Sequence, residues 1–98
     1  IGSLSYNGTI FVDSGAAKAL LNGKSLLAAG ITKINGNFKK GENVIILDQN
    51  NVQLARGLSS FSSIEIDRIK GKQSKEIETI LGYLSKTEVI HKDDMVLL

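Results

Sequence analysis

The chain has 98 residues, of which 42% are hydrophobic and 22% are charged, so it supports one globular domain with one core. The absence of cysteine excludes a disulfide framework and a thiolate metal site, and no apolar run is long enough to span a bilayer, so we expect no membrane partner. The net charge of +2 and the isoelectric point near 9.0 are mildly basic, whereas a dedicated nucleic-acid binder usually shows a clustered basic face.

The first third of the chain predicts two strands with helical segments between them. Residues 9–12 are rich in β-forming side chains and predict the first strand. Asp13 and Ser14 are both good N-caps, and the helix that follows ends at Asn22-Gly23. Residues 25–30 predict a single helical turn closed by glycine, and residues 31–34 predict the second strand.

The middle of the chain predicts a β-hairpin. Residues 44–47 form a continuous apolar run, typical of a strand buried on both faces. Residues 48–51 are Asp, Gln and Asn, which favour a turn. Residues 52–56 alternate apolar and polar side chains, as a half-buried return strand does. Gly57 is placed where a bend or bulge would need a glycine, and residues 58–61 are expected to extend the return strand.

The last third predicts two short helices and two closing strands. Residues 62–65 fit the capping-box pattern, and a second helix is expected between Ser74 and Gly82. Strands are expected at residues 88–90 and 95–97, around a polar turn. The apolar side chains expected on the buried faces of the two helices are Ile64, Ile66, Ile69, Ile77, Ile80 and Leu81. These elements together indicate a strand-dominated α+β fold, a mixed barrel with short helices.

Two glycine-containing stretches resemble part of a phosphate-binding P-loop. Residues 23–25 read Gly-Lys-Ser, but the motif needs a glycine five residues earlier, where this chain has Lys18. Gly36 and Gly41 have the spacing of the motif, but Glu42 follows, and a carboxylate there would repel phosphate. We therefore interpret both stretches as helix caps and turns.

The single histidine, His91, lies near Asp93 and Asp94 in the polar turn. One histidine with two turn carboxylates is a weak ligand set for a transition metal, and no serine lies in a nucleophile-elbow motif. We predict a solvated turn, no metal site and no catalytic residue.

Basic residues of the first half raise the question of nucleic-acid binding. If the first helix packs beside the turn before the hairpin, Lys18 would join Lys39 and Lys40 in one modest basic patch. Backbone N–H groups of Gly15 and Ala16, at a helix N-terminus, could add an anion site. The alternative, which charge alone leaves open, is a scattered solvated face.

Several segments of the first half resemble a PUA domain, a pseudobarrel that recurs in RNA-modifying enzymes. They are VDSGAAKAL (residues 12–20), SLLAAGI (25–31), GNFKKGENV (36–44) and ARG (55–57). The second half is similar to the C-terminal PUA domain of the bacterial glutamate 5-kinase family. The segments that carry this similarity are IKGKQSKEI (69–77), ILGY (80–83) and VIHKDDM (89–95).

This resemblance implies a single PUA domain over residues 8–98, preceded by a linker remnant at residues 1–7. Because the chain does not begin with Met, we expect a piece excised from a longer protein. The implied parent is a cytoplasmic enzyme that uses ATP and Mg²⁺ to phosphorylate the γ-carboxylate of glutamate, in proline biosynthesis. Its catalytic and ATP-binding residues belong to an N-terminal amino-acid-kinase domain outside this sequence, so we assign this chain no cofactor.

Two functional hypotheses follow from the resemblance. In the first, the chain is an accessory or regulatory domain whose partner is the kinase domain, within a possible homo-oligomer. In the second, it is an RNA-binding module. PUA domains generally present their first helix and adjoining glycine-bearing loops to RNA. The residues of this chain that match those elements are Gly15, Ala16, Lys18, Gly36, Lys39 and Lys40.

Overall fold

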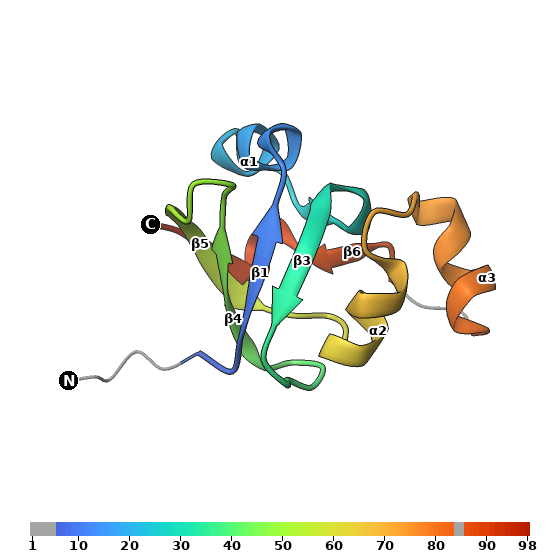
Figure 1. Ribbon diagram of the computed structural model, residues 1–98. Helices are drawn as coiled ribbons and strands as arrows, with labels where there is room; N and C mark the ends of the chain where they lie inside the picture. The colour runs from blue at the N-terminus through green and yellow to red at the C-terminus, as the bar shows by residue number, and fades with distance from the viewer. Residues whose placement is uncertain (1–5, 84–85) are drawn as a thin grey trace.

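The structure is a computed structural model that describes residues 6–83 and 86–98. Its strands form a five-stranded sheet in the order β3-β1-β4-β5-β7 and a separate pair, β2-β6 (Figure 1). In the larger sheet β1 and β4 run parallel, and the other neighbouring strands run antiparallel. The strands are β1 (Gly8–Val12), β2 (Leu26–Leu27), β3 (Ile31–Asn35), β4 (Asn43–Leu47), β5 (Gln53–Leu58), β6 (Glu88–Ile90) and β7 (Met95–Leu97).

Short helices connect these strands. α1 covers one end of the large sheet, whereas α2 and α3 lie together on one side of it (Figure 1). The α-helices are α1 (Ser14–Leu21), α2 (Ser63–Ile69) and α3 (Ile77–Leu81), and the 3-10 helices are η1 (Ala28–Gly30), η2 (Ser74–Glu76) and η3 (Lys92–Asp94). Asp13 caps α1 by accepting a hydrogen bond from the Ala16 N–H at 2.8 Å. The predicted capping box of α2 is present between Ser62 and Glu65.

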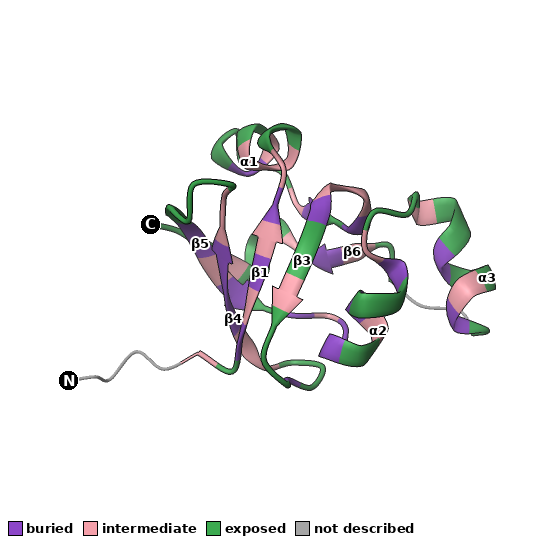
Figure 2. Cartoon of the chain, in the orientation of Figure 1, coloured by how far each residue is buried: buried purple, intermediate pink, exposed green. Residues whose placement is uncertain are grey.

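The core lies on the side of the large sheet that faces α2 (Figure 2). Ile10 and Val12 of β1, Val44 and Ile46 of β4, and Ala55 of β5 are fully buried there. Leu20 of α1 and Ile66 and Ile69 of α2 belong to the same cluster, which also includes Phe61, Val89 and Ile90. Because burying one such side chain contributes about 1.5–3 kcal/mol, this cluster is the main source of stability.

Most of the predicted elements are confirmed. The first strand, the first helix, the strand after residue 30, the central hairpin, the two later helices and the two closing strands all occur. The α+β, strand-dominated fold class is therefore correct. The closing strands do not pair with each other, because β6 pairs with β2 and β7 pairs with β5.

The prediction of a helical turn over residues 25–30 is wrong in its first half. Leu26 and Leu27 form β2, and only residues 28–30 are helical. Leu26 pairs with Ile90, far along the chain. This pairing is non-local, so local helix propensity gave no sign of it.

Three smaller predictions in the second half also need correction. β5 ends at Leu58 instead of continuing to residue 61, because the Ser59 hydroxyl makes hydrogen bonds with the Phe61 backbone and turns the chain. The hairpin bulge lies between Ile46 and Leu47 and not at Gly57. Ile64, expected on a buried helix face, is 74% exposed.

The predicted linker remnant, residues 1–7, lies mostly outside the described residues. At its end, the Asn7 N–H donates to the Asn43 carbonyl oxygen at 2.9 Å. This bond continues the pairing of β1 with β4, so the sheet pairing already begins before Gly8.

Candidate functional site

An open cleft of about 520 Å³ separates α1 from the segment β2–η1. Its walls are mainly small and apolar, with Lys24 at the rim; the lining residues are Asp13, Gly15, Ala16, Ala19, Lys24, Ser25, Leu26, Leu27, Ala29 and Gly30. A Cβ atom on Gly30 would lie 2.4 Å from the Ala16 Cβ. The glycine therefore lets α1 pack directly on η1 at the floor of the cleft.

A second hollow, of about 530 Å³, adjoins the cleft and shares Lys24, Ser25 and Leu27 with it. It extends toward Glu88, His91 and Lys92, next to η3. The Ser25 hydroxyl oxygen accepts a hydrogen bond from the Lys92 N–H at 2.8 Å, which fastens β2 to η3.

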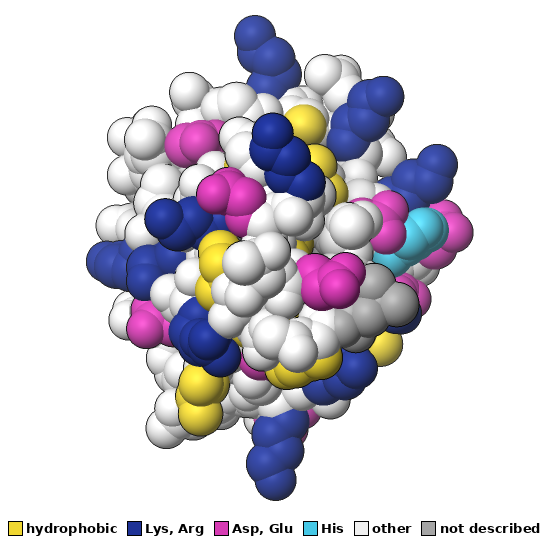
Figure 3. Space-filling view, turned by 90° about the vertical axis from the view of Figure 1, so that its right-hand side faces the viewer, with side chains coloured by type: hydrophobic (Ala, Val, Ile, Leu, Met, Phe, Trp, Pro, Cys, Tyr) yellow, Lys and Arg dark blue, Asp and Glu magenta, His cyan; other side chains and the backbone are white. Residues whose placement is uncertain are grey.

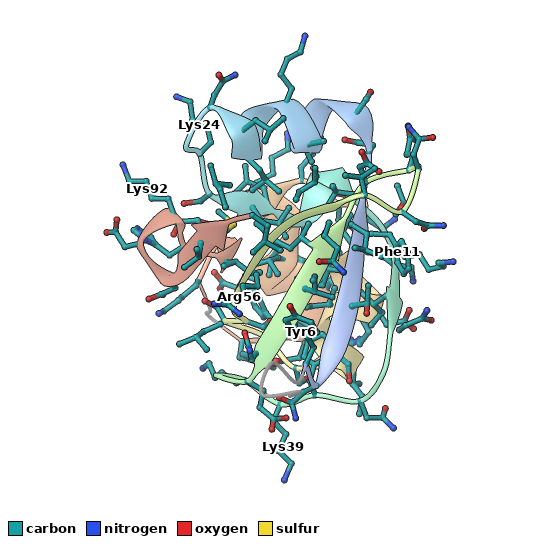
Figure 4. All side chains as sticks on the ribbon, turned by 90° about the vertical axis from the view of Figure 1, so that its left-hand side faces the viewer. Tyr6, Phe11, Lys24, Lys39, Arg56 and Lys92 are labelled. Carbon is teal, nitrogen blue, oxygen red and sulfur yellow. The ribbon has the colours of Figure 1, made fainter. Side chains whose placement is uncertain are left out.

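Two cationic side chains flank this combined hollow. Figure 4 shows Lys24 and Lys92 on the same side of the molecule, at the end that carries α1. They come from segments almost seventy residues apart, which the pairing of β2 with β6 brings together. The α1 end of the fold thus offers an apolar cleft with Lys24 at its edge, and an adjoining hollow that Lys92 and Glu88 both line. Such a cleft suits a ligand with an apolar part and a few polar groups.

His91 has a local structural role beside this hollow. Its Nδ1 atom accepts a hydrogen bond from the Asp93 N–H at 3.1 Å and so caps η3. The Asp93 carboxylate lies 3.6 Å from the same nitrogen. Among the described residues, no three His, Cys, Asp or Glu side chains gather as a metal ion would require.

The residues predicted at the first helix lie at this end of the fold but on two sides of α1. Gly15 and Ala16 line the cleft. The Ala16 N–H already donates a hydrogen bond to the Asp13 carboxylate. An anion expected at this helix end would therefore find this donor in use and a negative charge beside it. Lys18 is on the opposite side of α1, over a hollow that Asp48 also lines.

The other predicted residues lie at the far end of β1. Gly36 packs against the backbone of residues 7 and 8, where a Cβ would lie 2.8 Å from the Asn7 carbonyl oxygen. Figure 4 shows Lys39 at the end of the molecule opposite α1. The helix does not pack beside this turn, so Lys18 does not join Lys39 and Lys40 in one patch. Whether these residues contact RNA stays a prediction.

Carboxylates accompany both lysines of this turn. The Glu42 side chain accepts a hydrogen bond from the Lys39 N–H at 2.7 Å. Partial burial works to raise the pKa of the Glu65 carboxyl, but hydrogen bonds from Tyr83 and Ser62, and the nearby charge of Lys40, lower that pKa below its ordinary value. Two acidic side chains, Glu42 and Glu65, therefore lie close to this basic turn.

Sequence reasoning missed Lys24 and Lys92 as candidate binding residues. Lys24 belongs to the Gly-Lys-Ser stretch that we interpreted as a helix cap, and Lys92 lies in the last tenth of the chain. The sequence shows these two residues only as single lysines in two separate turns. Nothing local indicates that β2 pairs with β6 and so brings those turns together.

The side of the molecule that carries α3 differs from the α1 end. Figure 3 shows positive and negative side chains interspersed there, with the histidine at its edge beside acidic groups. This side presents no continuous surface of one charge. In residues 6–83 and 86–98, no helix has both the length and the apolar content to cross a membrane.

The sequence of this chain matches a known protein family. The profile of the PUA domain matches residues 8–81. The chain belongs to the PUA domain family. Two curated relatives are the glutamate 5-kinases of Pelagibacter ubique, 62% identical over 98% of this chain, and Bartonella henselae, 50% identical over the same share. This chain spans only 26% and 25% of the length of those two kinases.

Solved structures show the same fold. A PUA domain from Aeropyrum pernix, in complex with tartrate, superposes with a TM-score of 0.65 at 23% identity, over 87% of this chain and 41% of that one. The archaeal box H/ACA small ribonucleoprotein complex Nop10–Cbf5 gives a TM-score of 0.61 at 25% identity, over 86% of this chain and 24% of that one. These similarities confirm the predicted PUA-like pseudobarrel.

Proposed function

We propose that this PUA domain is the C-terminal accessory domain of a glutamate 5-kinase and regulates or assembles that enzyme. The observation that carries the proposal is the 62% identity to a glutamate 5-kinase over 98% of the chain. In this proposal the parent is a cytoplasmic enzyme of proline biosynthesis that phosphorylates glutamate.

ATP and Mg²⁺ belong, in this proposal, to the kinase part of that parent. Such a site needs carboxylates that share a Mg²⁺ ion with substrate phosphates. In this proposal the chain contributes through contacts with the kinase part or between subunits.

The test is a deletion in the full-length Pelagibacter ubique glutamate 5-kinase, removing the segment that matches this chain. We expect some kinase activity to remain, with a change in feedback regulation, Mg²⁺ requirement or oligomeric state. Steady-state kinetics and light scattering report these properties. If the truncated enzyme matched the intact one in kinetics and in assembly, the proposal would fail.

A second candidate function, RNA binding, is favoured by the lysines at the edge of the α1 cleft. The fold also occurs in an H/ACA ribonucleoprotein solved with a substrate RNA, although at 20% identity that likeness shows the fold alone. Phosphates of an RNA backbone would meet Lys24 and Lys92, and a base would lie in the open part of the cleft, above the contact between α1 and η1.

This candidate function is tested by titrating the chain with a folded, tRNA-like RNA at low and near-physiological salt. In Lys24→Glu/Lys92→Glu we expect much weaker binding and a salt slope reduced by about one unit per lysine. Lys39→Glu/Lys40→Glu makes the same charge change at the far end, where the sequence also predicts RNA contacts, so the pair of variants compares the two candidate surfaces. Equal losses in both variants, or binding that ignores salt, would argue against this cleft as the RNA site.

A further inference from the structure

One face of the large sheet carries no helix. Figure 4 looks onto this face, and α2 and α3 lie behind the sheet while α1 lies beyond its end. The register of the strands places one row of side chains across it, from Asn35 through Thr9, Ile45 and Arg56 to Val96. A second row runs from Lys33 through Phe11 to Leu47. We call the side chains of these two rows, together with Leu58, the open sheet face.

The open sheet face is apolar at its centre. Ile45 is only 5% exposed, yet it lies outside the main core cluster, so its burial comes from the neighbours on this face. Val96 and Leu58 remain about half exposed, at 56% and 48%. The Lys33 ammonium lies 4.4 Å from the centre of the Phe11 ring. Exposed apolar side chains gathered on one face mark a contact surface.

The charges on this face are all of one sign. The five strands of the large sheet contain no Asp or Glu, and their charged residues are Lys33 and Arg56. A partner that presents apolar groups with carboxylates at the edge would complement it.

The chain enters the sheet at one end of this face. Tyr6 lies two residues before β1 and is drawn on the same side in Figure 4, and the Asn7 N–H extends the pairing of β1 with β4. Residues 1–5 can span at most about 18 Å. In the proposed function the kinase part precedes this chain, so the connection to it leaves the domain at this end of the open sheet face.

From this placement we propose that the open sheet face docks onto an acidic-rimmed apolar surface of the kinase part of the same polypeptide. This inference rests on the proposed function. The size of the face fits it, because five strands of about five residues cover roughly 20 by 16 Å. That footprint suits the low end of contacts between domains of one chain and is too small for a stable obligate dimer.

Site-specific thiol labelling tests the proposal, because the chain has no cysteine of its own. Val96→Cys and Leu58→Cys probe the open sheet face, and Ile64→Cys, which is 74% exposed on α2, is the control. Labelling rates with a maleimide are compared between the 98-residue chain and the full-length kinase that carries it, with mass spectrometry to identify the labelled peptide.

We expect both probes on the face to react about tenfold more slowly in the full-length kinase, since a tethered partner near 1 mM that binds with a Kd of about 0.1 mM would cover most of the face. Ile64→Cys should react equally in both proteins. Adding Arg56→Glu should restore fast labelling at Val96→Cys, because it would face the partner's carboxylates.

Equal rates at all three positions in both proteins would overturn the docking proposal. If the labelling of the 98-residue chain became slower as its concentration increased, a second copy of the chain would be the occupant. If added RNA slowed the labelling, RNA would be the occupant. Either result would also overturn the docking proposal. The domain deletion separates the two proposals. If the face is protected from labelling but the deletion changes neither kinetics nor assembly, only the regulatory function is refuted. If the deletion changes kinetics or assembly but the face is not protected, only this docking surface is refuted.

Discussion

At the residue scale, Gly57 shows how close approach between segments constrains the sequence. A Cβ on Gly57 would lie 2.6 Å from the Asp94 carbonyl oxygen and 3.0 Å from the Ile90 side chain. Gly57→Ala would therefore push β5 away from the turn before β7. We expect a loss of about 1–3 kcal/mol in the free energy of unfolding, the usual cost of overpacking, measured by urea denaturation.

Gly15→Ala provides a matched control for this prediction. The nearest atom to a Cβ at Gly15 is 3.5 Å away, and the residue lies in α1, so alanine should stabilise the helix by a few tenths of a kcal/mol or more. A Gly57→Ala protein as stable as Gly15→Ala would contradict the close approach. The sequence indicated that position 57 requires glycine, but the reason, contact with residue 94, depends on tertiary structure.

At the element scale, the capping box of α2 links helix stability to pH. The Glu65 carboxylate accepts a hydrogen bond from the Ser62 N–H at 2.8 Å and another from the Tyr83 hydroxyl. The pKa of Glu65 is lower in the folded chain than its ordinary value of 4.5. The ionised carboxylate thus stabilises the fold fully above that value, and this stabilisation is lost as the pH falls below it, through the folded pKa.

Glu65→Gln tests this link. We expect the variant to be less stable than the parent chain at neutral pH, by about 1 kcal/mol or less for a largely exposed group, and the difference to shrink toward pH 3. Urea denaturation at the two pH values measures it. A difference that stays the same at both values would show that the ionised carboxylate contributes nothing specific.

Elements with a local signal could be predicted, and elements with a remote partner could not. A few adjacent residues determine each of three elements: the capping box at Ser62, the cap at Asp13 and the hairpin after Asn43. The strand β2 is only two residues long, and its partner Ile90 is far away in the sequence. For the same reason the sequence did not place Lys24 beside Lys92, or Lys18 away from Lys39.

At the scale of the whole molecule, the last strand closes the fold. β7 pairs with β5 in the large sheet, and Met95 packs against the core cluster. The Leu98 N–H adds a hydrogen bond to the Leu54 carbonyl oxygen at 2.9 Å. The C-terminal residues are therefore part of the sheet, although they form only its edge.

Removing residues 95–98 should consequently destabilise the entire domain. The loss of several backbone hydrogen bonds at about 1 kcal/mol each, with the burial of Met95, amounts to roughly 3–5 kcal/mol. That is a large part of the total stability of about 5–15 kcal/mol expected for a small domain, so the truncated chain should show a much lower urea midpoint. Val96→Thr, which keeps the strand and changes one exposed side chain, should unfold near the parent midpoint. If the truncation and Val96→Thr unfolded at the same urea concentration, β7 would be an appendage, and the sheet would be complete with β5 at its edge.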